Sequence, residues 1–182
     1  VSREARIEAM IEKYTVDLPN ITEKLERSII KDVHIILTGT TGYLGSYLLH
    51  YLLSNTSVSR IYCFNRTCDA KDRTAQSFAS KGLTDSLPFL SSPQVEFLHA
   101  KVGLPQFGLD DDTYALLVAN TDAIIHNAWT VNFNRGLESF EDPHINSVRN
   151  FIDLSIKTGG RARIFFISSI GAVSNYKSTL PP

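Results

Sequence analysis

A glycine-rich turn directly after a short apolar run is the feature that most limits what this chain can fold into. Residues 38–45 read Thr-Gly-Thr-Thr-Gly-Tyr-Leu-Gly, and they follow the apolar run 33–37. A compact apolar run closed by Thr-Gly is typical of a buried strand in a parallel sheet. We expect Gly39 to form a tight turn with an unusual φ angle, Gly42 to let a ligand approach the backbone, and Gly45 to let the next helix pack closely. The spacing therefore predicts a strand, a turn and a helix in direct succession.

The rest of the chain alternates between short apolar runs and segments of helical periodicity. Strands are expected over residues 33–37, 60–64, 94–98, 122–126 and 162–168, and helices over 3–14, 43–54, 69–81, 114–118 and 143–158. Strands that alternate with helices imply crossover connections, and hence a parallel sheet covered on both faces. The prediction is an α/β fold: a Rossmann-type doubly wound parallel sheet flanked by helices, with an N-terminal amphipathic helix. We divide the chain into a linker and helix over 1–30 and a nucleotide-binding domain over 31–182.

Composition excludes several classes of protein. The 182 residues are 43% hydrophobic and 20% charged, which is the profile of an ordinary globular domain and not of a disordered chain. Because 18 basic residues balance 19 acidic ones, no net field would attract nucleic acid or an anionic membrane. The apolar runs are too short to span a bilayer, and the cysteine and histidine spacing matches no metal site. We expect a cytoplasmic protein with no nucleic-acid, membrane or metal partner, and a buried thiol at Cys63.

In its strand–turn–helix context, the glycine turn predicts a dinucleotide-binding site. The N–H groups and the dipole of a helix that begins near Gly42 can hold an anionic pyrophosphate. We expect the cofactor to be bound by the turn residues Gly39, Thr41, Gly42, Tyr43, Leu44 and Gly45. The alternative is a glycine-lined turn that binds no ligand.

The residues after the second expected strand indicate which dinucleotide is bound. NAD-binding folds usually place Asp or Glu there for the ribose 2′-hydroxyl, but this strand ends in Asn65 and Arg66, with no carboxylate before Asp69. A guanidinium at Arg66 can pair with a 2′-phosphate through two hydrogen bonds. Arg73, one helical turn into the next element, is a second candidate. We therefore predict NADP(H), held in part by Asn65, Arg66 and Arg73; the alternative is a pair of solvated surface arginines.

The ends of the fourth and fifth expected strands supply the rest of a site. Ligands of open parallel sheets lie beyond the carboxyl ends of the strands, so we expect Asn127 and Ala128 to line the cofactor. His126 is expected to be a core histidine and not a catalytic one. Ser168 and Ser169 emerge at the same edge, where they can hydrogen-bond a substrate carbonyl beside the nicotinamide, and we count Ser168 among the cofactor-binding residues. The alternative is that both serines only satisfy loose backbone groups.

Taken together, these motifs resemble the extended short-chain dehydrogenase/reductase family. Within it, the chain looks like the terminal thioester reductase domains of fungal polyketide synthases and nonribosomal peptide synthetases. The most specific stretch is 126–134, followed by 139–141 and 143–145, and the resemblance covers nearly the whole chain. It implies NADPH-dependent release of an acyl or peptidyl thioester as an aldehyde, sometimes onward to an alcohol. The implied partner is a phosphopantetheine-bound thioester on an upstream carrier domain.

The resemblance also implies roles for individual residues. Ser169 matches the family's catalytic Ser/Thr position, which hydrogen-bonds the thioester carbonyl as hydride arrives. Asn146 matches an asparagine that supports the site from the following helix. The family often has Gly-Asp near the adenine after the third strand, whereas this chain has Ala100 and Lys101. That adenine contact is therefore not expected here.

A second departure concerns the family's Tyr-x-x-x-Lys pair. Tyr176 is followed at once by Lys177, and the fourth position along is Leu180, so Tyr176 does not fit the pattern. Without a tyrosine acidified by a lysine, a proton donor for the reduced carbonyl is missing. The chain also begins at a valine and stops at Pro181-Pro182. We therefore expect it to be the cofactor-binding portion of a longer reductase, and inactive by itself.

Other functions are compatible with the same motifs. A non-catalytic redox-sensing module would bind NADP(H) and pass its redox state to a partner. A sugar-nucleotide epimerase or dehydratase shares the fold, but it would usually hold NAD and carry an acidic residue where Arg66 stands. A stand-alone fatty-acyl reductase would lack the upstream carrier domain.

Overall fold

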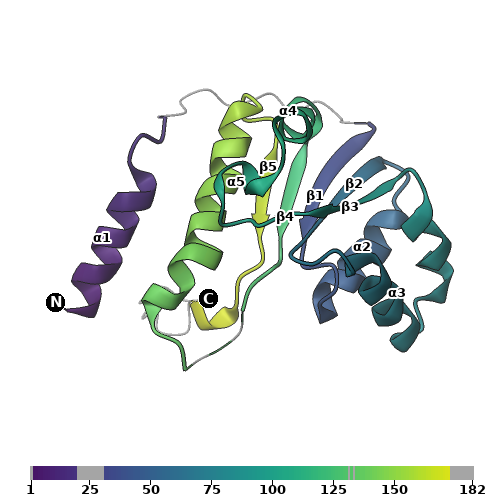
Figure 1. The fold of residues 1–182 in the computed structure, drawn as a ribbon, viewed down its shortest axis with the longest axis horizontal. Coiled ribbons are helices and arrows are strands. Elements are labelled where there is room, and N and C mark those ends of the chain that lie inside the picture. Colours follow the sequence, from purple (N-terminus) through teal and green to yellow (C-terminus); the bar gives the residue numbers. More distant parts are fainter. Residues whose placement is uncertain (1, 20–30, 131, 133, 173–182) are drawn as a thin grey trace, which may run out of the picture.

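A computed structural model describes residues 2–19, 31–130, 132 and 134–172 of the chain (Figure 1). One sheet of five strands, all parallel, has the order β3-β2-β1-β4-β5. The strands are β1 (Val33–Thr38), β2 (Val58–Asn65), β3 (Val95–His99), β4 (Ala123–His126) and β5 (Arg163–Phe166). The predicted parallel α/β fold is confirmed.

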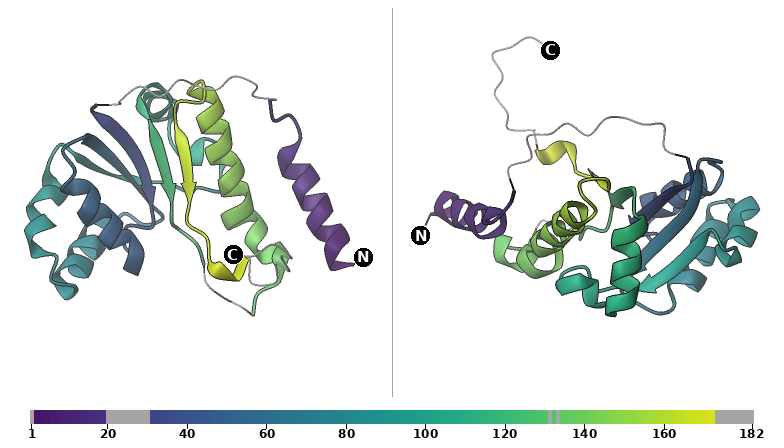
Figure 2. Two further views of the ribbon diagram at one scale, coloured as in Figure 1. Left: turned by 180° about the vertical axis from the view of Figure 1, so that it is seen from behind. Right: turned by 90° about the horizontal axis from the view of Figure 1, so that it is seen from above.

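Helices cover both faces of this sheet (Figure 2). The α-helices of the described residues are α1 (Arg3–Thr15), α2 (Tyr43–Leu53), α3 (Ala70–Ser80), α4 (Asp111–Asn120) and α5 (Asn146–Lys157), and α2 to α5 are those that cover the sheet. Side chains of α2 and α3 share one buried cluster with the sheet, and side chains of α4 and α5 share the other. Within the described part of the chain, no helix combines the length and the apolar character that crossing a bilayer requires.

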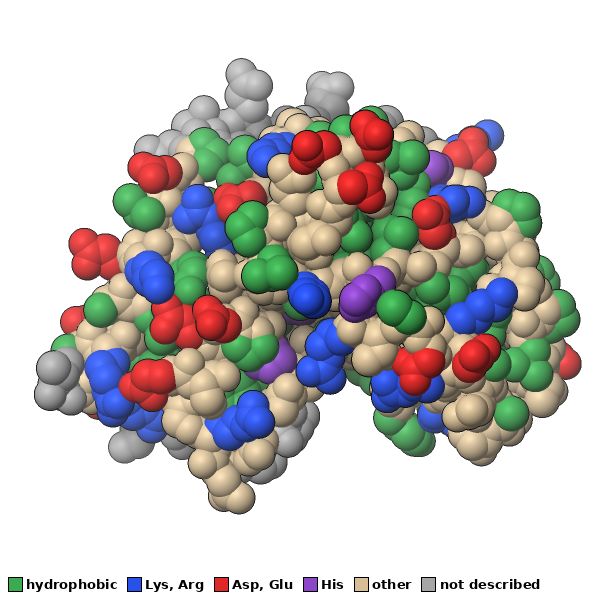
Figure 3. Space-filling view, in the orientation of Figure 1, with side chains coloured by type: hydrophobic (Ala, Val, Ile, Leu, Met, Phe, Trp, Pro, Cys, Tyr) green, Lys and Arg blue, Asp and Glu red, His purple; other side chains and the backbone are tan. Residues whose placement is uncertain are grey.

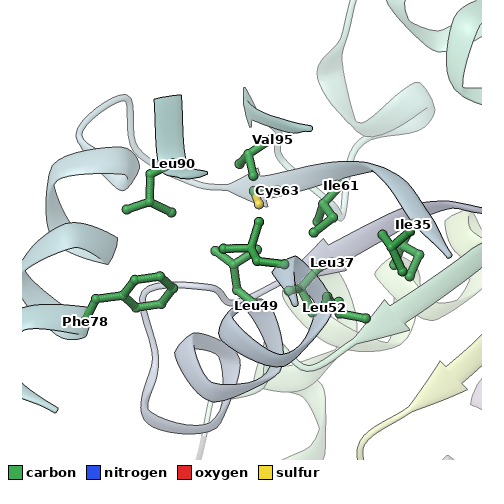
Figure 4. Close-up of a cluster of buried hydrophobic side chains, with 11 residues drawn as sticks. Ile35, Leu37, Leu49, Leu52, Ile61, Cys63, Phe78, Leu90 and Val95 are labelled. Atoms are coloured by element: carbon green, nitrogen blue, oxygen red, sulfur yellow. The ribbon is translucent and has the colours of Figure 1, made fainter. Parts of the chain in front are cut away.

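The two cores follow from the alternation of side chains along each strand. Ile35 and Leu37 face the α2 and α3 side, whereas Ile36 between them faces α4 and α5. Cys63 lies in the first of these clusters, near its centre and beside Val95 and Leu49 (Figure 4). Burial raises the pKa of its thiol far above the ordinary value, so Cys63 is the inert buried thiol that was expected.

The strand order creates a switch point at the centre of the sheet. From β1 the chain adds β2 and β3 on one side, and then crosses over to add β4 and β5 on the other. The carboxyl ends of the central strands are level, since Thr38 pairs with Phe64 of β2 and Leu37 with Ile125 of β4. Ligands of open α/β sheets bind outside the strand ends at such a point.

Some boundaries differ from the sequence expectations for local reasons. Asp110 caps α4 by accepting the N–H of Thr113 at 2.8 Å, and the helix runs further than the expected 114–118. The segment 141–145, which contains Pro143, forms a wider π-helical turn, so α5 begins only at Asn146. Proline lacks an N–H and disfavours regular helical bonding at that position. In addition, β5 ends at Phe166, so both candidate serines lie beyond it.

Helix α1 lies beside α5, away from the sheet (Figures 1 and 2). Its limits confirm the expected N-terminal helix, but none of its residues is fully buried. An ion pair joins Arg6 to Glu138 at 2.6 Å, and another joins Lys13 to Glu141 at 2.6 Å. Polar contacts therefore hold much of this helix in place.

Candidate functional site

The glycine turn connects the end of β1 to the start of α2. Gly39 has φ 75°, a left-handed conformation that favours glycine, and its carbonyl accepts the N–H of Gly42 at 3.0 Å. A Cβ atom on Gly45 would stand 1.9 Å from the carbonyl oxygen of Gly39. The turn is thus closed by direct backbone packing of α2 against its own entry loop, as the spacing predicted.

The start of α2 presents N–H groups that no side chain caps. Gly42 is the N-cap residue and makes no side-chain cap hydrogen bond, and it is exposed together with Tyr43 and Leu44. Uncapped N–H groups at a helix N-terminus, with the positive end of the helix dipole, suit an anion. The turn therefore fits the pyrophosphate of a dinucleotide, with Thr41 half-buried beside it.

Thr38, the last residue of β1, ties this turn to the end of β4. Its fully buried hydroxyl accepts the N–H groups of Asn127 at 3.0 Å and Ala128 at 2.8 Å. The same Oγ1 atom lies 3.0 Å from Nδ1 of His126. A hydroxyl has two lone pairs and one hydrogen, so with both lone pairs engaged the Thr38 O–H must donate to Nδ1.

The direction of the hydrogen bond from Thr38 determines which ring nitrogen of His126 carries the hydrogen. Because Nδ1 accepts, the ring hydrogen is on Nε2, which donates to the hydroxyl of Ser147 at 3.2 Å. The Ser147 hydroxyl in turn donates to the His144 carbonyl at 2.6 Å. Burial, and secondarily the charge of His144, lowers the pKa of His126 to about 4. His126 is therefore neutral near pH 7 and serves as a hydrogen-bonded core histidine, as expected.

The turn after β4 packs against the glycine turn. A Cβ on Gly39 would stand 3.2 Å from both the N and the Cα atoms of Ala128, and 3.1 Å from Nδ2 of Asn127. Both residues are half-buried. The two turns that were expected to line the cofactor are thus in contact at the switch point.

Asn65, at the end of β2, points into the protein. Only 6% of its surface is exposed; its amide donates to the Cys63 carbonyl at 3.0 Å and accepts the Thr40 hydroxyl at 3.0 Å. The side chain therefore holds Thr40 within the glycine turn. A direct contact of Asn65 with the cofactor stays a prediction, whereas its support of the turn is visible.

Arg66 is exposed, and its guanidinium has no hydrogen-bond or ion-pair partner among the described residues. Burial lowers the pKa of His144, and the positive charge of Arg66 is the second cause. His144 packs against Trp129 of the turn after β4, so the charge of Arg66 acts close to that turn. Arg73 is also exposed and donates to Thr67 at 3.4 Å. Figure 3 shows Lys, Arg and His side chains beside the notch between the two halves of the molecule.

The candidate serines lie at the same edge as these turns. The N–H of Ile167 donates to the His126 carbonyl at 3.0 Å and so keeps the chain after β5 beside β4. Ser168 and Ser169 follow and are exposed, and the Ser169 hydroxyl accepts the N–H of Gly171 at 3.1 Å. The expectations about Tyr176, Lys177 and Leu180 concern positions outside the described residues.

Asn146, the first residue of α5, supports the neighbouring loop. Its amide donates to the Gly103 carbonyl at 2.7 Å, which joins α5 to the segment after β3. In that segment Ala100 is buried and Lys101 is exposed. A supporting role for Asn146 therefore has a visible contact, although its contribution to catalysis stays a prediction.

Three residues of this site, Thr38, Ser147 and His144, were not predicted to have a role. Thr38 could have been noticed because a strand-end threonine directly precedes the first glycine. No local signal marks Ser147 and His144, since their importance comes from partners elsewhere in the chain.

Comparison with known proteins agrees with this geometry. Over 170 residues, the chain is 39% identical to a carboxylic acid reductase of Neurospora crassa, covering 93% of the chain and 16% of the relative. It is 33% identical to the adenylate-forming reductase Nps11 of Serpula lacrymans, covering 97% of the chain and 17% of the relative. The chain thus spans less than a fifth of the length of these curated relatives.

A solved structure is also similar to this chain. The terminal R domain of the myxalamid PKS-NRPS biosynthetic pathway is 26% identical, with a TM-score of 0.70 over 93% of this chain and 42% of that one. A family model described as "Male sterility protein" and built for NAD-binding domains matches residues 37–181. The matched region includes the glycine turn, the β4 turn and both serines. The chain therefore belongs to this family of nicotinamide-cofactor-binding Rossmann domains, described as male sterility protein.

Proposed function

We propose that this chain is the NADP(H)-binding portion of a thioester reductase that releases a carrier-bound acyl or peptidyl thioester as an aldehyde, with an alcohol as the alternative product. The observation that carries the proposal is the position of Ser169. It follows β5 at the sheet edge where the glycine turn and the β4 turn meet, and the bond from Ile167 to His126 holds it there. The relatives named above are reductases, and this supports the assignment.

The reaction requires little covalent chemistry from the protein. When bound, the reduced nicotinamide supplies a hydride to the thioester carbonyl carbon; the C–S bond then breaks, and the sulfur takes up a proton to leave an aldehyde and a thiol. The Ser169 oxygen accepts the N–H of Gly171, so its own O–H is left to donate to the carbonyl oxygen. A donor at that position stabilises the negative charge that develops on oxygen.

Replacing Ser169 by alanine in the full-length protein should lower kcat for a pantetheine thioester by about a hundredfold, the usual effect of losing such a donor. NADPH affinity should change little, because the hydroxyl acts on the substrate. Ser169→Thr is the matched control, since it restores a hydroxyl, and it should recover most of the activity. Stopped-flow measurement of NADPH oxidation tests both variants. An alanine variant as fast as the unaltered protein would contradict the role of Ser169.

We also propose that the cofactor is NADP(H), with Arg66 at the 2′-phosphate. Arg66→Ala should weaken NADPH binding about tenfold to a hundredfold, because hydrogen bonds to a charged group contribute about 1.5–3 kcal/mol. NADH affinity should stay within about twofold, since NADH has no 2′-phosphate for a guanidinium to bind. Arg163→Ala, at the opposite end of the sheet, is the control and should alter neither. Fluorescence titration measures both affinities, and equal binding of NADH and NADPH by the unaltered protein would disprove the preference.

The carrier-bound phosphopantetheine thioester is part of the same proposal. A full-length protein that reduces free pantetheine thioesters slowly and carrier-bound ones rapidly would support it. Tight NADPH binding without any thioester reduction would instead favour a non-catalytic redox module.

A further inference from the structure

A partly open, largely apolar cavity of about 330 Å³ lies between helices α1 and α5. This volume is in the range of pockets that bind small molecules. Its walls include Ile7, Met10 and Ile11 of α1, Val148 and Ile152 of α5, and Trp129 from the turn after β4.

Polar contacts hold α1 in place without closing this cavity. Besides the ion pairs from Arg6 and Lys13, the Arg149 guanidinium donates to the carbonyls of Tyr14 at 3.0 Å and Val16 at 2.9 Å. A surface helix normally buries its apolar stripe against a core, yet Ile11 is 57% exposed. The charged groups neutralise one another, so the space between the helices is left apolar and open.

Trp129 borders both this cavity and the turn after β4. This residue directly follows Ala128, and its ring lies 4.4 Å from that of His144 and 5.4 Å from that of Phe166. Phe166 ends β5, three residues before Ser169. One wall of the cavity therefore belongs to the turn that was assigned to the cofactor, and this wall contacts Phe166 at the end of β5.

We propose that this cavity binds the hydrocarbon chain of the acyl thioester substrate, while the carbonyl lies at Ser169. The proposal rests on the thioester reductase function and names its substrate class: an extended apolar acyl chain. Most of the lining is apolar, and its polar side chains Tyr14, Thr15 and Arg149 already hydrogen-bond to Glu141, Ile11 and Asp153 within the protein. Burying a charged or strongly polar group without a partner is costly. Apolar chains, in contrast, gain from leaving water in proportion to the area that they bury.

Trp129 is the only tryptophan in the sequence, so its fluorescence reports directly on the cavity. The probe is a decanoyl pantetheine thioester that carries bromine at the end of its chain, with the unbrominated thioester as reference. We expect saturable quenching of at least half of the Trp129 signal, measured as the difference from a Trp129→Phe variant. The acetyl pantetheine thioester, which cannot fill the cavity, should compete with the probe much more weakly than the unbrominated decanoyl thioester does.

A larger side chain that fills the cavity should prevent the acyl chain from binding there. Val148→Phe should lower the affinity for the decanoyl thioester at least tenfold. In the full-length protein, the same substitution should remove the preference in kcat/KM for decanoyl over acetyl substrates. Leu116→Phe on α4, whose side chain is 48% exposed and lies outside the cavity lining, is the matched control and should change neither. Unaltered NADPH affinity shows that both variants fold.

Failure of this proposal can be told apart from failure of the proposed function. If the full-length protein reduces thioesters but the probe does not quench Trp129, or Val148→Phe leaves the chain preference unchanged, the cavity does not bind the acyl chain. Iodide, a small soluble quencher, tests whether Trp129 is accessible to solvent. If neither iodide nor the probe quenches Trp129 fluorescence, another part of the protein covers the cavity and the proposal is likewise overturned. If no thioester is reduced, the reductase function fails, and saturable quenching alone decides whether the cavity binds acyl chains.

Discussion

Replacement of Gly45 by alanine should abolish binding of the nicotinamide cofactor. The new Cβ atom would stand 1.9 Å from the oxygen and 2.6 Å from the carbon of the Gly39 carbonyl. Both are backbone atoms, so no side-chain rotation can relieve the overlap. Either the turn opens or α2 moves away, and both changes displace the N–H groups expected to hold the pyrophosphate. We expect at least a hundredfold loss of NADPH affinity in a fluorescence titration, and a loss of about 3 kcal/mol in the free energy of unfolding.

Gly82→Ala is the control for this experiment. Gly82 also has a positive φ of 71°, but nothing lies within 4 Å of the added Cβ. Alanine there should cost only about 1–2 kcal/mol of backbone strain and leave NADPH affinity unchanged. If Gly45→Ala bound NADPH as tightly as Gly82→Ala, the packing of α2 against the turn would not be what shapes the site.

Replacement of Thr38 by valine should strongly destabilise the protein although the two side chains have nearly the same shape. Valine would leave the N–H groups of Asn127 and Ala128 and the Nδ1 atom of His126 without their partner in a buried site. An unsatisfied buried polar group costs about 1–3 kcal/mol. The sum, about 3 kcal/mol or more, is a large part of the roughly 5–15 kcal/mol that stabilises a typical domain. Urea unfolding at neutral pH measures this loss.

Thr38→Ser separates the hydroxyl from the methyl group. Serine keeps the three hydrogen bonds and lacks one methyl group, so this substitution should lower the free energy of unfolding by only about 1 kcal/mol. NADPH affinity should fall in the valine variant and hold in the serine variant, because the hydroxyl positions the turn at Ala128. Equal stability of the two variants would show that the shape of Thr38, and not its hydrogen bonds, matters.

Much of the fold could be predicted because it depends on local patterns. The apolar run 33–37 lies within β1, and the periodicity of 43–54 matches α2. The conformation of Gly39 followed from the spacing of the glycines, since few other residues adopt a left-handed φ. The π-helical turn at 141–145 was not predicted, because periodicity alone does not distinguish a widened turn from a regular one.

Local sequence patterns were enough to predict the parallel sheet, the position of the glycine turn, and the placement of Arg66 and Ser169 beyond the carboxyl ends of β2 and β5. The direction of the hydrogen bonds through His126 and the apolar cavity beside α1 became visible only in the packed protein. Thr38 and His126 are 88 residues apart, and Arg6 and Glu138 are 132 apart. Periodicity and turn chemistry act over a few neighbouring residues, whereas a shared hydroxyl or an ion pair between distant segments exists only once the chain has packed.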